Sequence, residues 1–301
     1  MARVLVAGGS GFIGRALVAK LRGRGDEVTV LTRAASAEQD GVRLEHWQPS
    51  DAAEARFSSD YDAVVNLTGE RAVGVRYTER TKSRILNSRV ESTNWLVRAI
   101  ERAERKPRVF VAGSAIGYYG SDLSAARVDE SAPSGSDFLA LVCVAWEAAA
   151  VRAEPLGVRV VRARTGIVLG GHGGPLDELV RPFKWFVGGP IGSGTQGFSW
   201  IHLDDEVAAL VRCIDDESLS GPVNLCAPNP VSNAELGRVV GELLHRPSGL
   251  KAPAFALRLL FGEGAEPLLG GQWGVPRALE RAGFSFQYTD VRAALGAAVA
   301  A

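Results

Sequence analysis

A glycine-rich turn between a strand and a helix constrains this chain more than any other feature. An apolar segment at 3–7 leads directly into Gly8, Gly11 and Gly14, and a helical pattern follows over 15–24. Gly8 allows a tight turn, Gly11 allows the backbone to approach a ligand, and Gly14 allows the helix to lie close to the sheet. The free amides that open such a helix bind phosphate groups. The unit therefore predicts a dinucleotide site.

The end of the next strand indicates which dinucleotide is bound. This strand is expected at 27–31 and is followed by Thr32 and Arg33. NAD sites usually place Asp or Glu there, whereas a guanidinium can pair with a 2′-phosphate in a bidentate manner. We therefore predict NADP(H) rather than NAD(H), the alternative being that Arg33 is a solvated loop charge. The residues expected at the cofactor from these two segments are Gly8, Gly11, Phe12, Ile13, Gly14, Thr32 and Arg33.

Strands and helices alternate along the rest of the first half. Further strands are expected at 42–47, 61–66, 108–112, 158–162 and 223–226, with helices over 78–105 and 137–152. This alternation predicts an α/β fold with a doubly wound parallel sheet, the Rossmann fold. We place the NADP-binding domain at 1–170, with a further strand near 222–227, and a smaller substrate lobe at 171–301. In the lobe, shorter helices are expected near 233–244, 253–261 and 276–282.

Composition excludes several classes of protein. The 34 basic and 34 acidic residues give a formal net charge of zero, which does not favour nucleic acid or an anionic membrane as a partner. The sequence has no apolar run long enough to span a membrane, and we expect no secretory signal. Cys143, Cys213 and Cys226 are dispersed, so we expect buried thiols, no metal site and a cytoplasmic protein.

The helix expected over 137–152 is apolar almost all round. Such a helix must be covered on more than one side. One interpretation is burial within the chain. The other is a homodimer contact that this helix makes together with the long helix over 78–105.

Several motifs together resemble a known family, the extended short-chain dehydrogenase/reductases of the nucleotide-sugar epimerase/dehydratase group. The glycine turn, Asn66-Leu67-Thr68-Gly69, the segment 114–120 and the segment 164–170 carry the likeness. Ser88-Arg89, Trp146-Glu147, the segment 198–202 and a tail from about 250 resemble one atypical subfamily, labelled epimerase-family proteins, some of them described as cell-division inhibitors. The resemblance implies cofactor contacts at Asn66, Leu67, Thr68, Gly69 and Arg89.

One departure from the family bears directly on chemistry. The family carries a Tyr-x-x-x-Lys motif, whose tyrosine is the acid/base and whose lysine binds the nicotinamide ribose. At those positions this chain has Leu139 and Cys143, and no Tyr-x-x-x-Lys occurs anywhere in it. Leucine cannot exchange a proton and a thiol is no fixed ammonium. The usual mechanism therefore does not carry over.

Three residues are candidates for the missing chemistry. Ser114 follows the fifth strand, Tyr118 or its neighbour Tyr119 supplies a phenol, and His202 titrates near neutrality. For each there is a structural alternative, namely a loop serine that caps amides, aromatic packing, and a hydrogen-bonded histidine. Asp204 and Asp205 are expected to cap a helix.

Two functions follow from these observations. The first is an NADP(H)-dependent epimerase or oxidoreductase that acts on a small polar substrate, with a nucleotide sugar as candidate, through an acid/base other than the family's tyrosine. The second is an NADP(H)-binding regulator without catalysis, which signals redox state or controls cell division.

Overall fold

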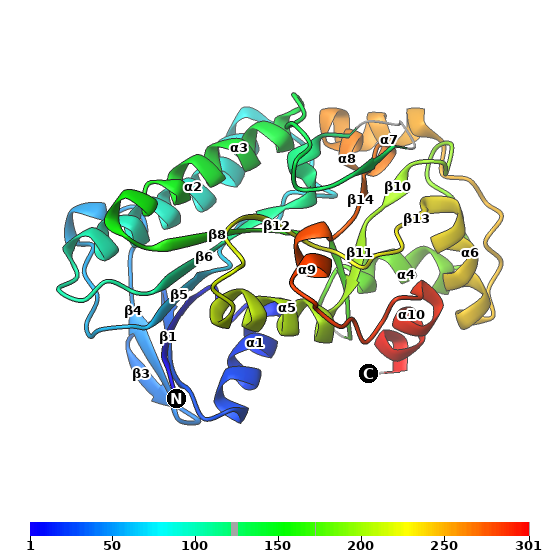
Figure 1. The fold of residues 1–301 in the computed structure, drawn as a ribbon. Helices are drawn as coiled ribbons and strands as arrows, with labels where there is room; N and C mark the ends of the chain where they lie inside the picture. Colours follow the sequence, from blue (N-terminus) through cyan, green and yellow to red (C-terminus); the bar gives the residue numbers. More distant parts are fainter. Residues whose placement is uncertain (122–125, 172, 301) are drawn as a thin grey trace.

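A parallel sheet flanked by helices forms the centre of the molecule (Figure 1). The computed structural model describes residues 1–121, 126–171 and 173–300. The sheet has eight strands, in the order β12 (Gly221–Leu225), β8 (Arg159–Thr165), β6 (Val109–Ala115), β5 (Ala63–Asn66), β1 (Arg3–Ala7), β2 (Glu27–Thr32), β4 (Val42–His46) and β3 (Ala37–Gln39). Within the described part of this sheet, only β3, which the sequence did not predict, pairs antiparallel. The prediction of a doubly wound Rossmann fold is confirmed.

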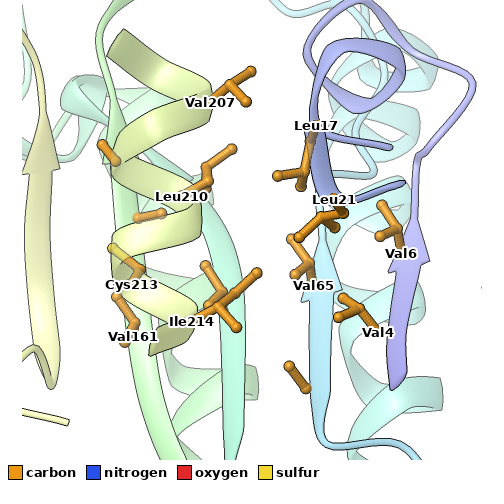
Figure 2. Packing of buried hydrophobic residues seen from close by; sticks show 14 of the residues in the cluster. Val4, Val6, Leu17, Leu21, Val65, Val161, Val207, Leu210, Cys213 and Ile214 are labelled. Atoms are coloured by element: carbon orange, nitrogen blue, oxygen red, sulfur yellow. The ribbon is translucent and has the colours of Figure 1, made fainter. Parts of the chain in front are cut away.

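The alternation of side chains along β1 explains why helices cover both faces of this sheet. Val4 and Val6 point to one face, where α1 (Phe12–Gly23) and α5 (Leu203–Asp215) lie. Leu5 and Ala7 point to the other, covered by α2 (Glu79–Arg102) and α3 (Phe138–Val151). Figure 2 shows the first of these cores, with side chains from α1 and α5 lying over the strands. Burial of strands on both faces is typical of parallel sheets.

The lobe has an apolar core of its own beside the two cores on the faces of the sheet. It is built by α4 (Leu176–Lys184), α6 (Asn233–Leu244) and α10 (Val291–Ala300) around the strand pair β9 (Ile167–Leu169) and β11 (Trp200–His202). Figure 1 shows this group next to α7 (Ala254–Phe261) and α8 (Glu266–Leu269). The lobe's helix α6 and, within one residue at their starts, α7 and α9 (Arg277–Arg281) agree with the prediction, whereas α4 and α10 were not predicted.

The C-terminal tail returns from the lobe to the edge of the sheet. Its short strand β14 (Trp273–Gly274) pairs with β7 (Arg127–Val128). Polar side chains then hold its main chain. Ser199 Oγ donates to Gln272 O at 2.7 Å, Asn224 Nδ2 donates to Val275 O at 2.9 Å, and Glu130 Oε1 accepts from Ala278 N at 3.0 Å. Asp205 accepts from the amides of Gln287 and Tyr288 at 2.7 and 2.9 Å.

Several predicted boundaries are wrong by a few residues. α1 begins at Phe12 rather than Arg15, because Gly11 already occupies the cap position. α2 ends at Arg102 rather than 105. β6 continues to Ala115, so Ser114 lies inside the strand and not after it. The end of β6 was predicted too early because Gly113 and Ser114, which still pair with β8, are not apolar residues.

The apolar helix α3 is covered on most of its surface by the sheet and by α2. Leu141 and Val144 on its remaining stripe are 56% and 36% exposed. A homodimer through this stripe stays a prediction. Among the described residues, no helix is both long and apolar enough to cross a membrane.

Candidate cofactor and substrate site

The glycine turn has the shape that a close-lying ligand requires. Gly8 has a φ of 83°, a left-handed conformation that glycine adopts without strain. A Cβ at Gly14 would lie 2.1 Å from the carbonyl oxygen of Gly8. Because α1 begins at Phe12, the amides of Phe12, Ile13 and Gly14 fall in its first turn, where backbone N–H groups have no partner within the helix. These are the donors expected to receive a pyrophosphate.

The second wall of this site is the turn after β5. Asn66 is buried, and its Oδ1 accepts from Thr68 N at 3.1 Å and from Thr68 Oγ1 at 2.6 Å. Its Nδ2 donates to Thr93 Oγ1 at 3.0 Å, which fixes the side chain against α2. A Cβ at Gly8 would lie 2.8 Å from the carbonyl carbon of Leu67. The predicted residues 66–69 therefore lie directly beside the glycine turn, at the point where the strand order reverses.

The turn after β2 presents the predicted specificity residue to solvent. Thr32 Oγ1 accepts from Ala34 N at 3.1 Å and thereby shapes this turn. Arg33 is exposed and makes no ion pair within the part of the chain that the structure describes. Its guanidinium is thus available to an anionic ligand, as the NADP(H) prediction requires.

Ser114 belongs to a buried polar network. Its Oγ donates to Glu147 Oε1 at 2.7 Å, and Arg164 contacts both carboxylate oxygens of Glu147 at 2.8 and 2.9 Å. Arg164 is 2% exposed and Glu147 is 4% exposed. The Ser114 hydroxyl is therefore committed to Glu147, and a catalytic role for it would require that this bond break or be shared.

The two adjacent tyrosines differ in their hydrogen bonds. The Tyr119 hydroxyl is buried, donates to Asn224 Oδ1 at 2.8 Å and accepts from Arg164 Nη1 at 2.9 Å. Burial raises the pKa of Tyr119 to about 12, so its phenol stays protonated. Tyr118 is half-buried, and the Arg164 guanidinium lies 3.5 Å from its ring centroid. Its hydroxyl makes no hydrogen bond to any described residue.

His202 has a structural position. It caps α5, with Nδ1 accepting from Asp204 N at 3.2 Å, and its ring lies 3.9 Å from that of Tyr288 in the tail. Burial lowers the pKa of His202, which favours the neutral ring that this cap needs. The prediction that Asp204 and Asp205 cap α5 is wrong, because His202 is the cap and both aspartates lie in the first turn. His202 has no hydrogen bond to Ser114 or Tyr118 among the described residues.

The positions of the absent motif lie at the start of α3. Leu139 is half-buried, and Cys143 is buried. Burial raises the pKa of Cys143 to about 11, so its thiol is neutral. Cys213 and Cys226 are also buried free thiols, as predicted. Arg89 on α2 approaches this place, with its guanidinium 5.1 Å from the ring of Trp146.

Glu206 is a buried acid that was not among the residues predicted from the sequence. Its carboxyl is fully buried in the first turn of α5, and Thr165 Oγ1 donates to Oε1 at 2.9 Å. Oε2 has no partner among the described residues, and burial raises the pKa of Glu206 to about 8. This acid is therefore largely protonated at neutral pH. In the sequence, Glu206 was visible only as a third acidic residue directly after Asp204 and Asp205, which were expected to cap the helix.

Comparison with known proteins places the chain in a family. Residues 4–226 match the model described as NAD dependent epimerase/dehydratase family. The chain belongs to that family. Residues 252–298 match a second model, described as Domain of unknown function (DUF1731).

Epimerase-family relatives match this chain over nearly its whole length. Epimerase family protein ML0860 of Mycobacterium leprae is 42% identical over 294 residues, which cover 97% of this chain and 94% of that protein. The chloroplastic SDR39U1 homolog of Arabidopsis thaliana is 41% identical over 300 residues, which cover 98% and 86%. The likeness to epimerase-family proteins that the motifs indicated is thus confirmed.

A solved structure is similar in fold as well as in sequence. Human epimerase family protein SDR39U1 (isoform 2), solved with NADPH, superposes with a TM-score of 0.89 at 35% identity and covers 99% of each chain. The nucleoside-diphosphate sugar epimerase of Corynebacterium glutamicum gives a TM-score of 0.79 at 34% identity, covering 99% of this chain and 58% of that one.

Proposed function

We propose that this epimerase-family protein binds NADP(H) across the ends of β1, β2 and β5 and uses it in hydride transfer. The observation that carries the proposal is the glycine turn, where a side chain at Gly14 has no room and the first amides of α1 are left for a ligand. Arg33, exposed and without an ion pair among the described residues, supports the phosphorylated dinucleotide. The NADPH bound in the human relative supports the same choice.

The NADP preference has a direct test. We expect Arg33→Ala to weaken NADPH binding about tenfold or more and NADH binding little, because only NADPH carries the 2′-phosphate that a guanidinium pairs with. Fluorescence titration of both nucleotides against wild type and variant measures this ratio. Arg98→Ala, an exposed arginine on the far part of α2, is the control and should change neither affinity. Equal losses for both nucleotides after the Arg33 substitution would contradict the assignment.

The substrate that we propose is small and polar, with nucleotide sugars as the first class to test. Support comes from the lobe beside the carboxyl ends of the strands, where open α/β sheets bind ligands. The Corynebacterium relative, named a nucleoside-diphosphate sugar epimerase, supports the same class. When bound, the nicotinamide supplies or accepts a hydride, and the chain must supply a proton donor or acceptor at the reacting oxygen.

Tyr118 is the best supported candidate for that proton transfer. The hydroxyls of Ser114 and Tyr119 are engaged in the structure and His202 uses its Nδ1 to cap α5, whereas the Tyr118 hydroxyl is bonded to no described residue. The Arg164 guanidinium against its ring fixes the orientation of the phenol. Tyr118 thus takes over, from the segment after β6, the role that the family's tyrosine performs on α3.

Turnover measurements test this function. With NADPH or NADP and a panel of nucleotide sugars and carbonyl compounds, wild type should show activity, and Tyr118→Phe should lose about 100-fold or more in kcat with unchanged NADPH binding. Tyr61→Phe is a matched control, since Tyr61 is buried in the core between the sheet and α2. Full activity of Tyr118→Phe would remove Tyr118 from the mechanism.

The absence of the usual acid/base pair favours a second function, a cofactor-binding regulator without catalysis. Leu139 and Cys143 at the motif positions carry this alternative. If wild type binds NADPH but turns over no member of the panel, and a protein partner is captured in only one redox state of the cofactor, the regulator is the better assignment.

A further inference from the structure

Arg89 is a cation that lacks a carboxylate partner within the described part of the chain. The only hydrogen bond of its guanidinium to a described residue is from Nη1 to the backbone oxygen of Ile85, at 2.9 Å. The ring of Trp146 covers the guanidinium at 5.1 Å, and the side chain is mostly buried. Burial of a charge is costly unless an opposite charge or several hydrogen bonds compensate it. The N–H groups at Nε and Nη2 are left for a ligand.

The nearest carboxylate is already engaged elsewhere. Glu70 follows the 66–69 turn and lies within electrostatic reach of Arg89. Both of its oxygens are bonded by Arg84, with Nε to Oε2 at 2.9 Å and Nη2 to Oε1. Arg84 lowers the pKa of Glu70 through this pair. Glu70 therefore does not compensate Arg89 directly, and the charge on Arg89 is directed to something that is not part of the chain.

The guanidinium lies between the 66–69 turn and the start of α3. A Cβ placed on Gly69 would lie 3.1 Å from Arg89 Cζ. On the other side, Arg89 lies against Trp146 of α3 and within electrostatic reach of Cys143. Cys143 stands where the family has its lysine. A positive charge thus occurs beside the lysine's position although the lysine is missing, and it comes from α2 instead of α3.

We propose that Arg89 replaces the missing lysine, and that its ligand is the nicotinamide-side ribose and the adjoining phosphate of the bound dinucleotide. This proposal rests on the proposed function. A planar guanidinium with two N–H groups left on one edge, at Nε and Nη2, suits a diol or a phosphate oxygen pair, which a single ammonium would contact as a point charge. Trp146 holds the plane of the guanidinium, and the small residue Gly69 leaves room for it. Leu139 has no ionisable group whose pKa a nearby cation could lower, so the charge of Arg89 serves cofactor binding alone.

Moving the charge back to α3 tests this inference. We expect Arg89→Ala to weaken NADPH and NADH by the same factor, about tenfold or more, because both nucleotides share the ribose and phosphate. Arg33→Ala, by contrast, should discriminate between them. Adding Cys143→Lys to Arg89→Ala should restore at least half of the lost affinity on a logarithmic scale. Arg98→Ala is the matched control on the same helix, and Arg89→Gln covers the case in which the alanine variant does not fold.

The outcomes separate this inference from the proposed function. If wild type binds neither nucleotide, the proposed function fails. If wild type binds and a folded Arg89→Ala or Arg89→Gln variant binds equally well, only the inference fails. A folded double variant with Cys143→Lys that binds no better than Arg89→Ala shows that the two positions do not present charge to the same group, and this also overturns the inference. Circular dichroism melts of each variant establish that it is folded.

Discussion

Gly14→Ala is expected to reduce NADPH affinity by about 100-fold or more, which corresponds to about 2.8 kcal/mol of binding free energy. The new Cβ would lie 2.1 Å from Gly8 O and 2.7 Å from Gly9 Cα. Both are backbone atoms, so neither can rotate away as a side chain would. The glycine turn or the start of α1 must shift. The N–H groups of Phe12 and Ile13 then no longer point at the phosphates.

The same helix supplies the control for this variant. A Cβ on Gly23, the last residue of α1, meets nothing within 4 Å. Gly23→Ala should bind NADPH as wild type does and change the free energy of unfolding by less than about 1 kcal/mol. Nucleotide titration and thermal melts of the two variants provide the comparison. A Gly14→Ala protein that binds NADPH like wild type would show that the turn does not hold the phosphates.

Glu147→Gln is expected to have the largest effect on stability, about 3 to 5 kcal/mol in the free energy of unfolding. The substitution leaves the Arg164 guanidinium, 2% exposed, without its charged partner. It also weakens the bonds from Ser114 and from Arg162, whose Nη1 lies 3.3 Å from Glu147 Oε2. Because these groups come from α3, β6 and β8, one lost charge loosens the contact of a helix with two strands.

Urea denaturation measures this effect, with Glu280→Gln as the matched control. Glu280 pairs with Arg277 on the surface of α9, where an ion pair contributes less than about 1 kcal/mol. The double variant Glu147→Leu/Arg164→Met removes both charges and should recover part of the loss, because buried pairs are often replaceable by apolar side chains. A Glu147→Gln midpoint equal to that of Glu280→Gln would mean that the buried pair stabilises no more than a surface pair.

Local patterns explain which parts of this molecule could be predicted from the sequence. The unit from β1 to β2 carries its signals within thirty-odd residues, so the strand, the turn and the second strand were predicted closely. α4 was missed because Pro182 and flanking glycines hide its short apolar face. α10 was missed because an alanine-rich segment has little periodicity.

The candidate site was predicted only where its residues are neighbours in the chain. The turn 66–69 was singled out because its four residues resemble a family motif, and the structure shows one buried amide, that of Asn66, holding it. The partners of Ser114 could not be found in this way, since Glu147 and Arg164 meet it only after α3 and β8 have docked. His202 gave the same difficulty, because a histidine that caps a helix and one that transfers protons look alike in a sequence.

Four polar side chains outside the tail hold it by hydrogen bonds to its backbone. Ser199, Asn224, Glu130 and Asp205 all bond to main-chain atoms of the tail, between Gln272 and Tyr288. Every residue offers a backbone carbonyl, and every residue except proline an amide, so these bonds do not depend on which residues the tail carries. Exposed side chains of this stretch, such as Arg277 and Glu280, are thus free to vary without loss of these bonds, whereas Leu279 is buried in the core. The hydrogen bonds that fix the path of the tail therefore depend on the four polar side chains that contact it, which lie outside the tail.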